Sequence, residues 1–131
     1  MADVKLKVGT DFFYPDVMIV CDKDDESDLY KTAPILIVEV LSKSTSKLDK
    51  TYKRLKYQTI PSLEYYVLIE QDKAEVIVFT KKESWQPYFY YLGDEITFHL
   101  LDLTVSVEEL YIHVNNEEVL AYLHEKRQTT G

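Results

Sequence analysis

The stretch from Pro34 to Ser42 constrains the fold of this chain more than any other part of the sequence. It reads Pro-Ile-Leu-Ile-Val-Glu-Val-Leu-Ser, an apolar and largely β-branched run with one carboxylate, Glu39. Such a run is typical of a strand buried on both faces, at the centre of a parallel or mixed sheet. An ionised glutamate in that position is costly unless a cation or hydrogen-bond donors meet it. Glu39 is therefore the first candidate functional residue.

A helix is predicted directly after this strand. Residues 44–46, Ser-Thr-Ser, are of the types that cap helix N-termini. The pattern that follows has two neighbouring stripes at helical spacing. The apolar stripe consists of Leu48, Tyr52 and Leu55, and the other stripe consists of Asp49, Lys53 and Tyr57. We expect Glu39 and the second stripe to face one cleft.

The other apolar patterns predict a single mixed sheet. Because the strand at 34–42, the helix and a strand at 63–70 follow one another, we expect a right-handed crossover between parallel strands. Residues 74–80 are predicted to return antiparallel as a hairpin. The remaining predicted strands cover residues 4–8, 16–21, 85–92 and 95–99, the last two at the sheet edge, with a helical turn at 107–111 capped by Ser106.

The bulk composition limits the classes of function. A chain of 131 residues fits one domain, spanning residues 1–131. The lone Cys21 excludes an internal disulfide and favours a reducing cytoplasm. No apolar run approaches the roughly 18 residues of a membrane helix, so no membrane association is expected. With three glycines there is no phosphate-cradling loop, which disfavours a nucleotide-binding protein.

The charge balance bears on nucleic-acid binding. A net charge of −8 argues against broad, non-specific binding of nucleic acid, and it leaves room for a local basic groove. Six of the fifteen basic residues lie within fourteen positions, namely Lys43, Lys47, Lys50, Lys53, Arg54 and Lys56. We expect Lys43, Lys47, Lys50 and Arg54 to position a DNA backbone beside the site. The alternative is an ordinary solvated outer face of the helix.

Two acids, Asp16 and Glu39, occupy strand positions among apolar neighbours, and Lys53 follows on the helix. Hydrolysis of a phosphodiester requires a hard divalent cation held by one or two carboxylates, with open positions for water and phosphate. A nearby lysine can orient the attacking water and offset negative charge. These residues suffice for metal-assisted cleavage. The spacing alone is a weak signal. We expect both acids to be buried, and this burial strengthens the signal because a buried acid without a function is costly.

These residues resemble the Uma2 family, also called DUF820, which is abundant in cyanobacteria and belongs to the PD-(D/E)xK nuclease superfamily. The resemblance covers nearly the whole chain. It is carried by residues 14–18 (Tyr-Pro-Asp-Val-Met), 36–42, Ser44, Thr45, Asp49, Lys53, Tyr57, 63–68 and 102–111. It implies an α/β (α+β) restriction-endonuclease-like core, with a central mixed sheet flanked by helices and a metal site at the central strands.

The resemblance also implies roles for single residues. Asp16 matches the first acid of the superfamily motif and Glu39 matches the second. Both are expected to hold magnesium or manganese, and the Val40 carbonyl is expected to add a ligand. The superfamily has a lysine where this chain has Leu41. Lys53 on the helix is expected to supply that function, with Asp49 one turn away to orient it.

Uma2 proteins usually carry an N-terminal helix and hairpin before the first strand predicted here. Because this chain starts close to that strand, we expect that portion to be missing. Many nucleases of this fold act as dimers, so the family also implies a homodimer.

Each candidate has a structural alternative. Asp16 could cap a turn, and Glu39 could form a buried salt bridge to Lys53 or Arg54. Lys53 could be solvated or form an i, i+4 pair with Asp49, and Tyr57 is interpreted as a packing residue. The sequence thus favours a magnesium-dependent DNA endonuclease. The alternative is a catalytically degenerate, homodimeric interaction domain of the same fold.

Overall fold

The computed structural model describes residues 5–20, 30–41 and 47–112, with the backbone alone at 47–49. The predicted capping residues 44–46, Cys21 and Lys43 therefore lie outside the described residues. The elements in chain order are β1 (Leu6–Val8), β2 (Asp11–Phe13), β3 (Val17–Val20), β4 (Pro34–Leu41), α1 (Lys47–Tyr57), β5 (Tyr65–Glu70), β6 (Glu75–Thr80), β7 (Pro87–Tyr91), β8 (Glu95–Phe98), β9 (Leu103–Ser106) and α2 (Val107–Leu110), with 3-10 turns at Lys81–Glu83 and His99–Leu101.

A five-stranded mixed sheet forms the centre of the fold, in the order β3-β4-β5-β6-β7. β4 and β5 are parallel and run in register from Leu36 opposite Tyr65 to Leu41 opposite Glu70. The other neighbouring pairs are antiparallel. The predicted parallel pairing of these two strands and the hairpin after them are therefore confirmed. β4 is covered on both faces, as its apolar run predicts.

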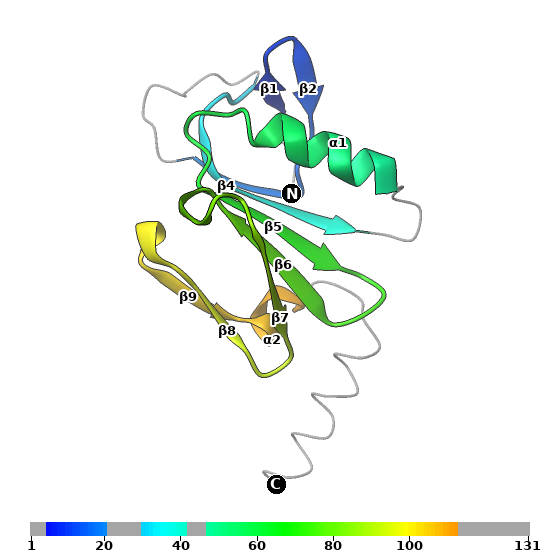
Figure 1. Cartoon of the computed structure of the whole chain (residues 1–131), viewed down its shortest axis with the longest axis vertical. Coiled ribbons are helices and arrows are strands. Elements are labelled where there is room, and N and C mark those ends of the chain that lie inside the picture. The colour runs from blue at the N-terminus through cyan, green and yellow to red at the C-terminus, as the bar shows by residue number, and fades with distance from the viewer. Residues whose placement is uncertain (1–4, 21–29, 42–46, 113–131) are drawn as a thin grey trace, which may run out of the picture.

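Both faces of the sheet are covered, by different elements (Figure 1). On one face α1 and the β1–β2 hairpin pack against the sheet, with Ile37, Tyr66 and Phe79 in the shared core. On the other face β8, β9 and α2 cover a second core that contains Val38 and Val67. Because side chains alternate along a strand, Glu39 lies on the same face as Ile37, the face that α1 covers.

The edge of the sheet differs from the prediction. β7 is an edge strand as expected, but β8 leaves the sheet and pairs with β9 instead. A tight turn follows β7. Asp94 accepts a hydrogen bond from the Tyr91 N–H through its carboxylate (2.8 Å) and donates its own N–H to the Tyr91 carbonyl (3.0 Å). The backbone groups of Tyr91 are thus satisfied locally, and β8 packs over the sheet face.

The orientation of α1 is fixed by its contacts with the β1–β2 hairpin. The Asp11 carboxylate lies 2.9 Å from Lys56 Nζ and accepts a hydrogen bond from the Tyr52 hydroxyl at 3.3 Å. In this orientation Tyr52 and Leu55 are 48% and 56% exposed, whereas Tyr57 is fully buried. Tyr52 and Leu55 of the predicted apolar stripe are therefore largely exposed to solvent. Instead, the neighbouring stripe with Lys53 and Tyr57 turns toward the sheet.

The C-terminal part of the described chain confirms the predicted helical turn. Ser106 caps α2, because its hydroxyl accepts a hydrogen bond from the Glu109 N–H at 3.1 Å. Within the parts of the chain that the structure describes, no helix is long and apolar enough to cross a membrane.

Candidate active site

The candidate active site lies at the carboxyl ends of the parallel strands β4 and β5, on the face that α1 covers. Glu39 is the third residue from the C-terminal end of β4, and it is only 6% exposed. Its neighbours along the same face of the strand, Ile37 and Leu41, are apolar and buried. The carboxylate therefore depends on partners from other elements.

Helix α1 supplies two of these partners. The Tyr57 hydroxyl donates a hydrogen bond to Oε1 of Glu39 at 3.0 Å. The ammonium group of Lys53 lies 3.7 Å from Oε2. The second distance is that of an ion pair without a short hydrogen bond. The predicted meeting of Glu39 with the polar stripe of the helix is thus what the structure has, since Lys53 and Tyr57 are four residues apart on α1.

Tyr57 does more than pack. Burial raises the pKa of its hydroxyl far above the ordinary value, and the neighbouring Glu39 carboxylate adds to the rise. The Asp16 carboxylate contributes a smaller upward effect. The hydroxyl therefore keeps its proton and acts as a donor toward Glu39. The interpretation of Tyr57 as a packing residue was incomplete, because the sequence does not show where its hydroxyl points.

Asp16 reaches the site by a different route from the one expected. It immediately precedes β3 instead of starting it, and its side chain is exposed, so the expectation that both acids are buried is wrong for Asp16. Its Oδ2 accepts a hydrogen bond from the Val40 N–H at 2.8 Å. The pairing of β3 with β4 ends at Val17 opposite Val38. The N–H of Val40, two residues further along β4, has no strand partner there, and the Asp16 carboxylate takes that place.

The predicted basic residues are only partly brought to the site. Lys50 forms an ion pair with Glu70 at 3.7 Å. The guanidinium of Arg54 lies over the Phe79 ring, 5.2 Å from its centroid. The backbone of Lys47 belongs to α1, and Lys43 lies outside the described residues. Lys50 and Arg54 thus turn toward the sheet from the same helix as Lys53.

Glu70 is a further acid at the site that the sequence reading did not select. It ends β5 opposite Leu41 and is therefore beside the end of the strand that carries Glu39. The Gln71 N–H donates to the Leu41 carbonyl at 3.1 Å, which keeps the two strand ends aligned. The signal was available in the sequence, because a parallel crossover places both strand ends at one edge of the sheet.

The oxygen donors of Asp16 and Glu39 fit a hard divalent cation that retains part of its water shell. In an extended strand the N–H and C=O of one residue point to the same side, so the Val40 carbonyl faces the side on which Asp16 lies. Among the described residues, no three acidic, histidine or cysteine side chains form a cluster that could enclose a metal.

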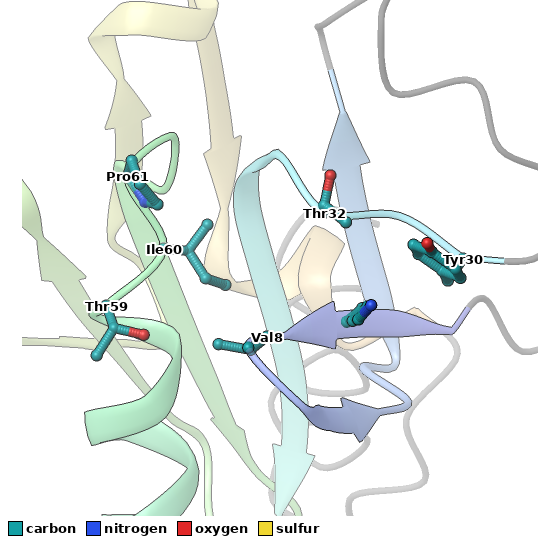
Figure 2. A pocket seen from close by; sticks show the side chains of 8 residues that line it. Val8, Tyr30, Thr32, Thr59, Ile60 and Pro61 are labelled. Atoms are coloured by element: carbon teal, nitrogen blue, oxygen red, sulfur yellow. The ribbon is translucent and has the colours of Figure 1, made fainter.

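A separate pocket of about 320 Å³ lies away from these residues, beyond the C-terminal end of α1 (Figure 2). Figure 2 shows Thr59, Ile60 and Pro61 on one side, with Val8, Tyr30 and Thr32 from the N-terminal part of the chain on the other. Lys7 and Gly9 complete the lining. None of the predicted site residues lines this pocket.

Two relatives in the cyanobacterium Synechocystis sp. are similar to this chain. The uncharacterized protein slr1290 is 30% identical over 115 residues, which are 84% of this chain and 60% of that protein. The uncharacterized protein sll1609 is 41% identical over 76 residues, which are 54% of this chain and 43% of that protein. This chain therefore spans about half the length of these relatives.

The fold is similar to that of a solved protein from Anabaena variabilis, whose crystal structure is described as that of "a putative nuclease belonging to DUF820". The TM-score is 0.61 at 18% identity, over 85% of this chain and 66% of the other. The similarity confirms the predicted fold, a mixed sheet of the nuclease-like DUF820 type. A family model described as "Putative restriction endonuclease" matches residues 1–110. With that match over most of its length, the chain belongs to the Uma2 family.

Proposed function

We propose that this chain is a metal-dependent endonuclease that hydrolyses DNA phosphodiester bonds, with magnesium or manganese as its cofactor. The observation that carries the proposal is the hydrogen bond from Val40 to Asp16 (2.8 Å), which holds one carboxylate beside the strand that carries the buried Glu39. The description of the family as "Putative restriction endonuclease" supports the same reaction class. The lone Cys21 favours a reducing cytoplasm as the setting.

In this proposal Asp16, Glu39 and the Val40 carbonyl hold the cation. When bound, magnesium supplies a Lewis acid that polarises the phosphate and makes water a better nucleophile. Lys53, whose ammonium group lies 3.7 Å from Glu39, orients the attacking water and offsets the charge that develops on the phosphate. The water oxygen bonds to phosphorus and gives up a proton to solvent, while the ester P–O bond breaks and the leaving oxygen takes up a proton.

The DNA backbone is bound by basic residues of α1 and of the segment before it, namely Lys43, Lys47, Lys50 and Arg54. Because the chain has a net charge of −8, these contacts are local, and the rest of the surface repels DNA. Affinity for DNA is therefore expected to fall steeply as the salt concentration rises.

Cleavage of supercoiled plasmid in the presence of magnesium or manganese tests the function. The comparison is between the unmodified chain and Glu39→Gln, which removes the charge but keeps an oxygen that can accept from Tyr57. Nicking by the unmodified chain that Glu39→Gln lacks supports the proposal. Equal nicking by both would show that another protein or another site cleaves the plasmid.

The alternative function is a catalytically inactive, homodimeric interaction domain. One observation favours it, namely that Tyr57 and Lys53 already satisfy the Glu39 carboxylate from within the chain. The melting temperature measured with added magnesium or manganese distinguishes the endonuclease from the interaction domain, because a ligand that binds only the folded state raises the melting temperature. An interaction domain would show no rise. In the endonuclease the rise would be absent from Glu39→Ala.

A further inference from the structure

Tyr57 ends α1, and its side chain is fully buried beneath the candidate active site. Its ring has edge-to-face contacts with Phe13 of β2 and Tyr66 of β5, at centroid distances of 5.2 and 5.3 Å. The contacts come from two separate elements of the fold, and such aromatic pairs prefer one relative geometry. The phenol ring, and with it the hydroxyl, therefore has a defined position.

This hydroxyl makes the two oxygens of Glu39 unequal. Oε1 accepts the Tyr57 hydrogen bond at 3.0 Å in a buried setting, whereas Oε2 faces the half-buried Lys53. Loss of the hydrogen bond would remove one donor from a buried carboxylate, which is unfavourable. Tyr57 therefore sets the rotation of the carboxylate, so that Oε2 is the oxygen on the more open side.

We propose that Tyr57 is a positioning residue that orients the Glu39 carboxylate for the divalent cation. It touches neither the substrate nor the cation, and it acts through Glu39 alone. The inference rests on the proposed function, because it requires that Glu39 binds a cation. Residues that hydrogen-bond a metal ligand commonly change metal affinity or activity by about 10- to 100-fold when they are removed.

The test compares Tyr57→Phe with a matched control on the same helix, Tyr52→Phe. Each change removes one hydroxyl and keeps the ring. The Tyr52 hydroxyl donates to Asp11 of β2 at 3.3 Å, and the Tyr52 side chain is 48% exposed. Calorimetric titration with Mn²⁺ is expected to show an affinity about 10-fold or more weaker for Tyr57→Phe and unchanged for Tyr52→Phe. A folded Tyr57→Phe that binds Mn²⁺ as tightly as the unmodified chain would overturn the inference, even if it melts at a lower temperature.

A second measurement uses the unmodified chain and does not depend on the folding of the variant. The buried hydroxyl proton of Tyr57 can be observed by NMR and assigned through its proximity to the rings of Phe13 and Tyr66. Its resonance is expected to shift as Mg²⁺ is added and to stop shifting when calorimetry indicates saturation. A resonance that stays in place at saturating Mg²⁺ would contradict the role of Tyr57.

The two proposals fail in different ways. If the unmodified chain binds neither Mn²⁺ nor Mg²⁺, the proposed function is wrong and the role of Tyr57 is wrong with it. If the unmodified chain binds the cation and Tyr57→Phe binds it equally, the proposed function stands and only the positioning role is excluded.

Discussion

The carboxylate of Asp16 accepts a hydrogen bond from the backbone N–H of Val40, with 2.8 Å between Oδ2 and N. The two residues are 24 positions apart in the chain. The bond continues the contact between β3 and β4 just beyond their last pair, Val17 and Val38. The exposed carboxylate of Asp16 therefore lies beside Val40, the residue that follows Glu39 in β4. One hydrogen bond thus extends the β3–β4 contact and also holds a carboxylate at the candidate metal site.

The change Asp16→Asn separates these two roles. The amide oxygen of Asn can still accept from Val40, so the free energy of unfolding is expected to stay nearly unchanged. The negative charge is lost, so calorimetric affinity for Mn²⁺ and plasmid cleavage should both fall sharply. Asp16→Ala is the matched variant, and it should in addition lose about 1 kcal/mol of stability with the hydrogen bond. Full cleavage by Asp16→Asn would exclude Asp16 as a ligand.

The change Lys53→Gln tests whether the lysine acts on the reaction or on the cation. The Lys53 ammonium group lies 3.7 Å from Glu39 Oε2, and the Lys53 side chain is 33% exposed. A cation at Glu39 would be repelled by this group, so its removal is expected to leave Mn²⁺ affinity equal or higher. Plasmid cleavage at saturating Mn²⁺ should nevertheless fall by about 100-fold, the scale of one general-acid or electrostatic contact. Unchanged cleavage would mean that Lys53 is only a structural partner of Glu39.

The ion pair between Asp11 and Lys56 predicts a pH-dependent contribution to stability. Lys56 holds the pKa of Asp11 below its ordinary value of 3.8, and Asp11 raises the pKa of Lys56 above 10.5. The Asp11 contribution is present above 3.8 and is lost as the pH falls through the lowered pKa. The Lys56 contribution is full below 10.5 and is lost as the pH rises through the raised pKa.

Thermal melting of Asp11→Asn across the pH range checks this expectation. The variant should melt at a slightly lower temperature than the unmodified chain near neutral pH, and the difference should vanish at both acidic and alkaline extremes. Asp72→Asn is the control, because Asp72 is exposed and has no ion pair with any described residue. A difference that persists unchanged at acidic pH would show that the charge of Asp11 does not matter.

The change Tyr111→Phe is expected to be the most destabilising single-atom deletion among these variants. The Tyr111 hydroxyl lies within 2.5 to 3.1 Å of the carbonyls of Glu70, Lys73 and Glu75, and it accepts from the Glu75 N–H at 3.2 Å. It therefore ties the end of α2 to the turn between β5 and β6. Its loss removes the side-chain group that contacts all of these backbone atoms, at a cost of about 1–3 kcal/mol.

Urea unfolding measures that loss. Tyr88→Phe is a suitable control, since the Tyr88 hydroxyl is 3.4 Å from Glu83 and its side chain is 46% exposed. The control should change the free energy of unfolding by less than about 0.5 kcal/mol. Equal stability of Tyr111→Phe and the unmodified chain would show that water replaces the hydroxyl at this turn.

The elements that the sequence predicts correctly are those with a strong local signal. The β-branched run at 34–42 predicts a central strand, and the order of strand, helix and strand predicts the parallel pairing of β4 with β5. β2 and β9 were not predicted as separate strands, because each is short and gains its partner only when the chain folds back. The placement of β8 was wrong for the same reason, since local alternation does not name the neighbouring strand.

By itself, the sequence determined the family and the mixed sheet, because these depend on residue types and their order, and it selected Asp16 and Glu39 as candidates. Only the tertiary structure decided how those acids are held. The Asp16 carboxylate is exposed and accepts a hydrogen bond from Val40, and the buried Glu39 carboxylate contacts Tyr57 and Lys53. The rotation of α1 about its axis produces this arrangement. That rotation follows from contacts with the β1–β2 hairpin and the sheet, which lie too far away in sequence for helical periodicity to predict.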